Sequence, residues 1–393
     1  MMDMQGIADL EATMKRRISA LPARIRPFTV EYQALPRALL LTGARGVGKT
    51  TFLLHHAKDR TILYFSADNP LFAGESLYDT IKSVFLAGFS GIVIDEVHYA
   101  RDWALHLKAL YDDFPEHRIW VSDSSSLVLR SGVGDLSRRF VPIRMPLLSF
   151  REFLFLETGR TFPVLDPFSK GVNPLVVPTP DILNAFRKYR AMGTRPFYAE
   201  GNFEDRLLAV LDKTLYSDIP FFLPNVTDGN LRLMKAITGT LAASPIPRLK
   251  VTSLCADWGI GADKLYQIVE VMESVGVLRI IRVEHDTKAK SVGAKLFFSD
   301  PAMYTVLRGN PGTARESLVA AFCAEAGWSV EASRDESMGD FLISNNRQGV
   351  RTSFRIEVGG SGKKRKHSDF VVRDDIDLPG ANAIPLWMLG MMY

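Results

Sequence analysis

The 393-residue chain has little cysteine and no long apolar run. Its two cysteines, Cys255 and Cys323, are too few and too far apart for a disulfide scaffold or a cysteine-rich metal site. No segment approaches the roughly 18 consecutive apolar residues of a membrane-spanning helix, and the first residues lack the apolar core of a signal peptide. We therefore expect a cytoplasmic protein with reduced cysteines and no membrane partner.

The charge is also close to balance. The formal net charge is only +4, which by itself gives no argument for nucleic-acid binding. Apolar residues make up 47% of the chain and charged residues 23%, which is typical of a folded globular protein. The length exceeds that of one compact core, so we expect two or three domains.

One stretch has the pattern G-x-x-x-x-G-K-T. It lies between the apolar run Ala38–Leu41 and a helical pattern at Thr51–Ala57. Backbone N–H groups in such a loop curl around a phosphate at a helix N-terminus, where the helix dipole favours negative charge. Lys49 would reach the β- and γ-phosphates, and the Thr50 hydroxyl would coordinate Mg²⁺. The expected phosphate-binding residues are Gly43, Ala44, Arg45, Gly46, Val47, Gly48, Lys49, Thr50 and Thr51, the alternative being an ordinary glycine turn.

Short apolar runs alternate with helical patterns around this loop. Continuous hydrophobicity indicates strands buried on both faces, so we expect a three-layer α/β domain with a parallel sheet over residues 1–150. The expected strands are Ala38–Thr42, Ile62–Ser66, Ile92–Asp95, Arg118–Ser122 and Val141–Met145. The expected helices are Thr50–Lys58, Leu77–Leu86, Trp103–Phe114 and Ser126–Arg130.

Two acidic residues follow the third of these apolar runs. Asp95 ends the run, at the edge of the sheet where ligands gather in open α/β folds. It could hold Mg²⁺ through water, while Glu96 activates the water that attacks the γ-phosphate. The distance of about 45 residues from the phosphate loop strengthens this assignment.

Weaker signals follow the next strand. Ser124 could sense the γ-phosphate, whereas Ser125 or Ser126 could equally cap the helix that follows. Arg138 or Arg139 could stabilise transition-state charge, in cis or across a subunit interface, or be solvated. Residues 1–36 form a helical lead-in whose basic side chains are either solvated or in contact with DNA or a partner: Lys15, Arg16, Arg17, Arg24 and Arg26.

These motifs together resemble a prokaryotic AAA-superfamily ATPase family. The resemblance rests on Gly43–Thr50, Ile94–His98, Trp103 with Leu107–Asp112, Ser124-Ser125, Leu136–Arg139 and Pro146–Phe153. It implies the roles given above for Lys49, Thr50, Asp95 and Glu96, and makes Arg139 the expected arginine finger. The chain departs from the family at two places: Asp123-Ser124-Ser125 stands for Gly-Ser-Ser, and Arg138-Arg139 for Gly-Arg.

The family also carries a winged-helix segment and a restriction-endonuclease-like C-terminal domain. After a proline-rich connection at 151–228, residues 229–309 read as the winged helix, with helices at Leu231–Ala242, Val251–Asp257 and Ala262–Val275. Strands at Val277–Glu284 and Ala294–Ser299 would form the wing, with Lys288, Lys290 and Lys295 near its tip. The exposed face of the third helix is acidic, so a structural or protein-docking role competes with DNA contact.

Residues 310–393 resemble the nuclease-like fold in which Glu, Asp and Glu-x-Lys hold a metal. The order is a helix at Arg315–Ala326 with Glu316, a strand at Phe341–Ile343 after Asp340, and a strand at Phe354–Val358 with Glu357. Other expected strands are Trp328–Ala332, Phe370–Arg373 and Ala383–Leu389. The triplet Glu357-Val358-Gly359 lacks the lysine, so we expect a domain without cleavage activity. Lys363 or Lys364 could substitute for it, but both lie in a stretch that looks like the tip of a hairpin.

The sequence thus predicts an Mg²⁺-dependent ATPase that uses Lys49, Thr50, Asp95 and Glu96, with Arg139 as the finger. No guanine-recognition motif is present, so ATP is the expected nucleotide. We expect that ATP hydrolysis drives a DNA-associated motor or switch. The alternatives are a nucleotide-switched protein-interaction module and an ATP-gated nuclease. A homo-oligomer is expected if the finger acts in trans.

Overall fold

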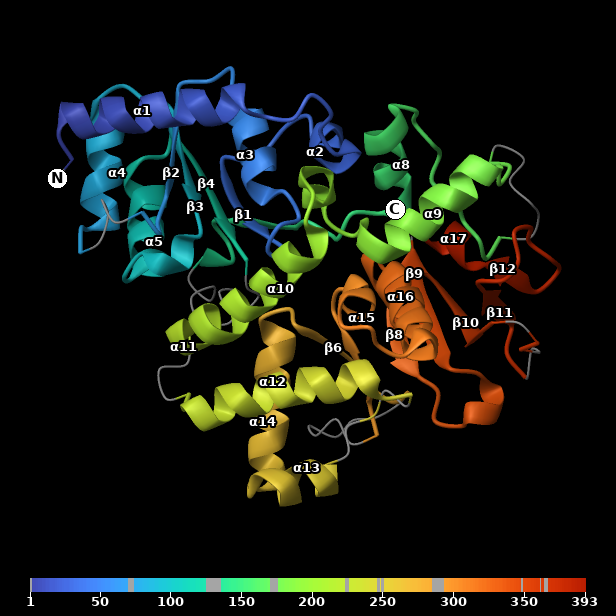
Figure 1. Cartoon of the computed structure of the whole chain (residues 1–393). Coiled ribbons are helices and arrows are strands. Elements are labelled where there is room, and N and C mark those ends of the chain that lie inside the picture. Colours follow the sequence, from blue (N-terminus) through green and yellow to red (C-terminus); the bar gives the residue numbers. More distant parts are fainter. Residues whose placement is uncertain are drawn as a thin grey trace. The chain divides into compact units, whose positions relative to one another are not determined.

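Every apolar run predicted as a strand between Ala38 and Met145 forms a strand of one parallel sheet in the computed structural model. The order is β2-β3-β4-β1-β5 (Figure 1). The strands are β1 (Ala38–Thr42), β2 (Ile62–Ser66), β3 (Gly91–Asp95), β4 (Arg118–Asp123) and β5 (Val141–Arg144). The predicted parallel α/β arrangement is confirmed.

The chain divides into two compact units, Met1–Pro146 and Leu147–Tyr393. The structure describes residues 2–69, 74–124, 136–169, 176–222, 226–245, 248, 251–284, 293–347, 349–360, 362–363 and 367–393. The predicted helix Ser126–Arg130 and the residues Ser125, Lys288, Lys290 and Lys364 lie outside these ranges. Over the described ranges, no helix is both long and apolar enough to cross a membrane.

Helices cover both faces of the parallel sheet (Figure 1). On one face, Leu40, Ile94 and Val121 pack in a single buried cluster with side chains of α4 (Leu77–Leu86) and α5 (Trp103–Asp113). On the other, α3 (Lys49–Ala57) contacts β2, β3 and β4. The helix α1 (Met4–Ser19) contacts the edge strand β2, and α2 (Pro27–Glu31) precedes β1.

The strand order brings the functional segments to one edge. β4 lies between β1 and β3, so the loop after β1 and the residues that end β3 and β4 meet at the carboxyl edge of the sheet. In the register, Thr42 pairs with Asp123 and Ser66 pairs with Asp95. Parallel strands always place their carboxyl ends together, and this is where ligands bind in open α/β sheets.

The second unit begins with helices. They are α8 (Phe150–Thr158), α9 (Pro180–Met192), α10 (Phe203–Lys213) and α11 (Ile219–Phe222), the last two joined by a π-helical turn at Thr214–Asp218. A capping box starts α8, in which Ser149 accepts a hydrogen bond from the backbone N–H of Glu152 and the Glu152 carboxylate accepts one from the N–H of Ser149.

Three further helices and a β-hairpin follow in the predicted order. They are α12 (Asp228–Ala243), α13 (Val251–Trp258) and α14 (Ala262–Ser274), then the antiparallel pair β6 (Leu278–Ile281) and β7 (Lys295–Phe298). The face of α14 predicted to point inward is buried, with Leu265, Ile268, Val269 and Met272.

The chain ends in a mixed sheet of order β12-β11-β10-β9-β8. After α15 (Ala302–Val306) and α16 (Pro311–Glu325) come β8 (Ser329–Ala332), β9 (Phe341–Arg347), β10 (Val350–Gly359), β11 (Phe370–Arg373) and β12 (Ala383–Pro385). The prediction of a strand over Ala383–Leu389 is wrong in its second half, because Leu386–Leu389 form a helical turn, α17. All four of these side chains are buried, so burial alone did not separate strand from helix.

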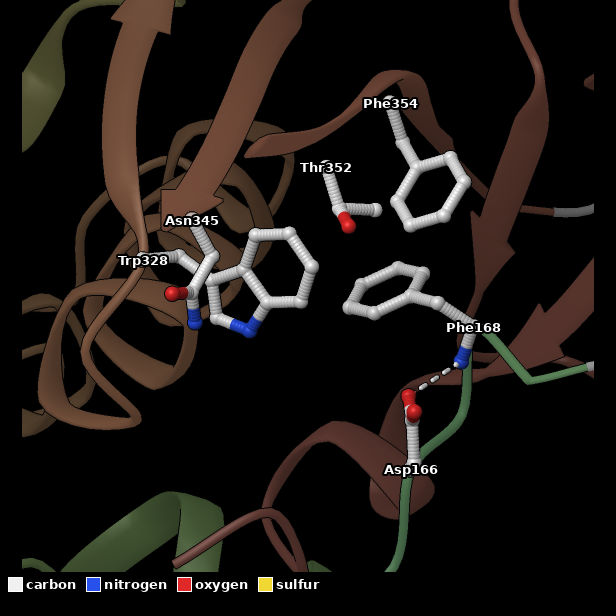
Figure 2. Close-up of a pocket in the computed structure, with 6 residues that line it drawn as sticks. All are labelled: Asp166, Phe168, Trp328, Asn345, Thr352 and Phe354. Carbon is white, nitrogen blue, oxygen red and sulfur yellow. Dashed lines mark hydrogen bonds between the residues drawn. The ribbon is translucent and has the colours of Figure 1, made fainter. Parts of the chain in front are cut away.

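Aromatic side chains hold the segment before α9 against this sheet. Phe168 stacks on Phe354 of β10, with ring centroids 5.4 Å apart, and meets the edge of Trp328 at 5.2 Å. These three aromatic residues line a small surface pocket together with Asp166, Asn345 and Thr352 (Figure 2). Contacts of this kind add about 0.5–1.5 kcal/mol beyond the burial of the rings, so they stabilise the packing of Phe168 against the sheet.

Two leucines of α5 provide a test of the sheet's helical cover. Leu107 is completely buried, whereas Leu105 is 63% exposed. We expect Leu107→Ala to lower the free energy of unfolding of the N-terminal unit by about 2–5 kcal/mol, and the control Leu105→Ala to change it by less than about 0.5 kcal/mol. Hydrogen–deuterium exchange of β3 and β4 peptides in the full chain measures the effect of each variant. Equal protection in the two variants would contradict the packing of Leu107 against the sheet.

Candidate functional site

The phosphate loop has backbone geometry that requires glycine. Gly48 has φ of +105°, a left-handed conformation at the position that directly precedes α3. At Gly43, a Cβ atom would lie 2.5 Å from the carbonyl oxygen of Met145, so no larger residue fits without movement of the backbone. Glycine at these two positions therefore allows the loop to reach the N-terminus of α3 in this conformation.

Lys49 lies inside this loop rather than in solvent. Its Nζ donates hydrogen bonds to the carbonyl oxygens of Gly43, at 2.9 Å, and Ala44, at 3.4 Å. Burial lowers the pKa of Lys49, while Glu96 and Asp95 act in the opposite direction. The loop thus holds the ammonium group where phosphate oxygens could replace its own carbonyls.

Asp95 is the centre of a hydrogen-bond network. Its Oδ2 accepts hydrogen bonds from Thr50 Oγ1, at 2.6 Å, and from the Tyr64 hydroxyl, at 3.1 Å. Its Oδ1 accepts one from Ser122 Oγ. The two residues predicted to bind Mg²⁺ are therefore in direct contact, although 45 positions separate them in the chain. Thr51, in the same turn of α3, is half-buried.

Glu96 lies beside them in a strained backbone conformation, with φ of +50°. Ser124 Oγ donates a hydrogen bond to Glu96 Oε2 at 3.1 Å, and Arg45 Nη1 lies 3.4 Å from Oε1. Burial raises the pKa of Glu96, which Lys49 and Arg45 partly offset. Positive φ in a residue other than glycine is a feature of functional sites, where surrounding contacts must hold it. All predicted residues of the loop, Asp95, Glu96 and Ser124 thus gather at one edge of the sheet.

Two further residues at this edge, His98 and Asp123, were not predicted as part of the site. His98 Nδ1 lies 2.7 Å from Asp123 Oδ2, and the backbone N–H of His98 donates to the same oxygen at 3.2 Å. His98 Nδ1 is also 3.7 Å from Glu96 Oε2, and both new residues are buried. The sequence did contain a signal for these two residues. Asp123 stands where the resembled family has glycine, and a buried carboxylate needs a partner.

The comparisons with known proteins agree with this geometry. Residues 35–154 match the family model described as an AAA domain, and nearly all of that match lies in the N-terminal unit. The N-terminal unit is therefore similar to an AAA domain, and we refer to it as the AAA domain. An uncharacterised protein of Methanocaldococcus jannaschii, MJ1637, is 26% identical over 375 residues, covering 84% of this chain and 76% of that protein.

Two solved structures show weaker similarity. The Walker-type ATPase PABY2304 of Pyrococcus abyssi aligns at 14% identity and a TM-score of 0.40, covering 78% of this chain and 97% of that one. RuvB of Thermotoga maritima aligns at 17% identity and a TM-score of 0.28, covering 70% of this chain and 89% of that one. These scores are too low for an inference about function.

The donor atoms of the AAA domain suit a nucleotide and Mg²⁺. Mg²⁺ prefers oxygen ligands, and the Thr50 hydroxyl and Asp95 carboxylate supply them side by side. The buried ammonium of Lys49, held by loop carbonyls, is a suitable partner for phosphate oxygens. The residues present therefore fit both groups that an AAA-type ATPase domain implies.

Arg26 supports the loop from the N-terminal lead-in. It is only 4% exposed, and its Nη1 donates hydrogen bonds to the carbonyl oxygens of Val47, at 2.8 Å, and Pro146, at 3.0 Å. Arg17 likewise bonds the Tyr64 hydroxyl at 3.3 Å. Of the basic lead-in residues, these two therefore have structural partners in the AAA domain, and neither the solvated nor the DNA-contacting reading describes Arg26.

Arg139 lies apart from the phosphate loop. Its Nε and Nη2 donate to the two carboxylate oxygens of Asp112 at 2.9 and 2.8 Å. It precedes the first residue of β5, Val141, which pairs with Leu39 near the start of β1. The loop follows the opposite end of β1, so the structure does not bring Arg139 to the phosphate site of its own chain.

Removal of Arg26 tests its support of the phosphate loop. Arg26→Ala leaves two carbonyl oxygens without this donor, so we expect the free energy of unfolding of the N-terminal unit to fall by about 1–3 kcal/mol. We also expect weaker binding of a fluorescent ATP analogue, measured by titration. Arg16→Ala, on the exposed face of α1, is the matched control and should leave both quantities unchanged. Unchanged nucleotide affinity in Arg26→Ala would mean that the loop holds its conformation without Arg26.

Proposed function

We propose that the protein hydrolyses ATP to ADP and phosphate in an Mg²⁺-dependent reaction. The observation that carries this proposal is the contact of Thr50 with Asp95, directly beside Glu96 and the buried Lys49. A phosphate loop, two oxygen ligands for a metal ion and a carboxylate base are the parts that phosphoryl transfer to water requires.

Each side chain has a distinct role in this reaction. Thr50 and Asp95 would hold Mg²⁺, which neutralises charge on the β- and γ-phosphates when bound. Lys49 exchanges its loop carbonyls for phosphate oxygens and stabilises the charge that moves to the β–γ bridging oxygen as the bond breaks. Glu96 accepts a proton from the water whose oxygen forms the new bond to the γ-phosphorus.

The neighbours of Glu96 serve to position it. Ser124 donates a hydrogen bond to Glu96 Oε2, and the buried pair of His98 and Asp123 lies against the same oxygen. We infer that these three residues orient the Glu96 carboxylate toward the attacking water. The sequence predicted that Ser124 senses the γ-phosphate directly. In this proposal Ser124 instead acts through Glu96.

The proposal predicts that Glu96 is needed for chemistry but not for binding. Glu96→Gln keeps the shape of the side chain and removes the base, so phosphate release should fall by about 10²–10⁴-fold while ATP binding is retained. The matched control is Glu116→Gln, which changes an exposed glutamate of the same unit and should have wild-type activity. Chelation of Mg²⁺ should also stop phosphate release. Wild-type turnover in Glu96→Gln would contradict the assignment of the base.

We further propose that Arg139 acts as an arginine finger on a neighbouring copy. The proposal is supported by its place before β5, at the edge of the sheet opposite its own phosphate loop. A finger contributes about 10³–10⁵ to the rate in related chemistry, so Arg139→Ala should be nearly inactive.

A mixing experiment separates a trans role from a cis role. Lys49→Ala removes phosphate binding but keeps the finger, whereas Arg139→Ala keeps the loop and removes the finger. If the finger acts in trans, mixing the two inactive variants should restore part of the ATPase activity, because some interfaces then combine an intact loop with an intact finger. No recovery in mixed oligomers, with exchange of subunits verified, would show that Arg139 does not act across an interface.

What ATP hydrolysis drives is the subject of a separate proposal. The exposed side chains of α14 include Asp263, Lys264, Gln267 and Glu270, a face whose small net negative charge does not attract the DNA backbone. This observation favours a nucleotide-switched protein partner over the DNA-associated motor or switch predicted from sequence. Phosphate release measured with and without duplex DNA decides between them, with Glu96→Gln as the background control. Stimulation by DNA would restore the DNA-associated role.

A further inference from the structure

Five charged side chains meet in the second unit, far along the chain from the phosphate loop. We call them the five-charge cluster: Glu316 on α16, Asp340 directly before β9, Glu357 on β10, Lys295 on β7, and Lys363. The three carboxylates are the ones that the sequence assigned to a nuclease-like metal site. The structure brings all three into one place, together with two ammonium groups.

Lys295 lies between two of the carboxylates. Its Nζ is 2.8 Å from Glu316 Oε2 and 3.2 Å from Asp340 Oδ1, and it lies 4.8 Å from the centroid of the Phe341 ring. The residue is only 5% exposed. Burial alone would lower the pKa of Lys295, but the two carboxylates raise it above its ordinary value, so the side chain keeps its charge at neutral pH.

Lys363 pairs with the third carboxylate. Its Nζ is 2.7 Å from Glu357 Oε1, and the Glu357 side chain is completely buried. A Cβ atom at Gly359 would overlap the Cβ and Cγ of Lys363. Gly359 occupies the position where the nuclease-like pattern has its lysine, and the absence of a side chain there lets Lys363 fold over the site.

A divalent metal ion does not fit this arrangement. Asp340 has both oxygens engaged, since Oδ1 faces Lys295 and Oδ2 accepts a hydrogen bond from the Val358 N–H at 2.8 Å. An ion shared by Glu316 and Asp340 would have to occupy the position of the Lys295 ammonium, and like charges a few ångströms apart in a buried site repel strongly.

We propose that Lys295 takes the place of a divalent cation, so that the five-charge cluster is a metal-free site in which the chain's own lysines supply the positive charge. The cluster then joins the β6–β7 hairpin to α16 and the mixed sheet, because Lys295 belongs to the hairpin and its two partners do not. The C-terminal segment on this account does not cleave nucleic acid by a metal-dependent route. This inference is independent of the ATPase proposal.

The experiment is to ask where ferrous iron binds on the full chain. Fe²⁺ with ascorbate and peroxide produces hydroxyl radicals that cut the backbone beside the bound ion, and mass spectrometry locates the cuts. With an ATP analogue present, cuts near Thr50 and Asp95 provide an internal control for Fe²⁺ binding in the N-terminal unit, where Glu96, His98 and Asp123 also offer ligand atoms. The proteins compared are the wild type, Lys295→Arg, Asp340→Asn, Lys295→Met and Lys295→Met with Asp340→Asn.

We expect no cuts near Glu316, Asp340 or Glu357 in the wild type or in Lys295→Arg, which retains the positive charge. Lys295→Met has similar length without charge, so it should gain cuts at these three places at millimolar Fe²⁺. The additional Asp340→Asn substitution should remove them again. Circular dichroism confirms that each variant is folded.

Two results would overturn the proposal. Cuts at the cluster in the wild type that disappear in Asp340→Asn would show that the site binds metal with Lys295 in place. A folded Lys295→Met that gains no cuts would show that the lysine is not what excludes the ion. If Lys295→Met does not fold, Lys295→Gln, which also lacks the charge, takes its place in the same comparison.

Discussion

The hydrogen bond of 2.6 Å between Thr50 and Asp95 joins the two motifs on which the N-terminal unit depends. It exists because β4 lies between β1 and β3, which brings the loop after β1 and the ends of β3 and β4 to one edge of a parallel sheet. Lys49, Glu96 and Ser124 are then within reach of the same small volume. Buried charges are costly unless they are paired, so the alignment of these groups must persist for the unit to be stable.

Both units contain buried carboxylates, which have partners of different kinds. In the AAA domain, the partners of Asp95 are the hydroxyl groups of Thr50, Tyr64 and Ser122. Hydroxyl groups can coordinate a metal ion together with the carboxylate, so this arrangement suits Mg²⁺. In the five-charge cluster the partners are ammonium groups, which already supply the positive charge. The same residue type, aspartate, therefore favours an exchangeable cation in one place and excludes it in the other.

Departures from the family pattern are accompanied by new partners in the structure. Asp123 replaces a glycine and meets the backbone N–H and Nδ1 of His98. Gly359 replaces a lysine and makes room for Lys363, which pairs with Glu357. A change at a buried site that left a polar group unpaired would cost several kcal/mol. At these two positions a comparison of motifs alone misses the partner that the structure supplies.

The sequence by itself determined the parallel sheet and the phosphate-loop motif, and it singled out Lys49, Thr50, Asp95 and Glu96, because these depend on local patterns of apolar runs, glycines and charges. Only the tertiary structure decided the partners of Arg26, His98 and Lys295, which lie 21, 25 and 45 positions from Val47, Asp123 and Asp340 respectively. It also placed Arg139 away from its own phosphate loop. Such pairings depend on strand order and on which side chains share a buried volume, and no short-range pattern encodes either.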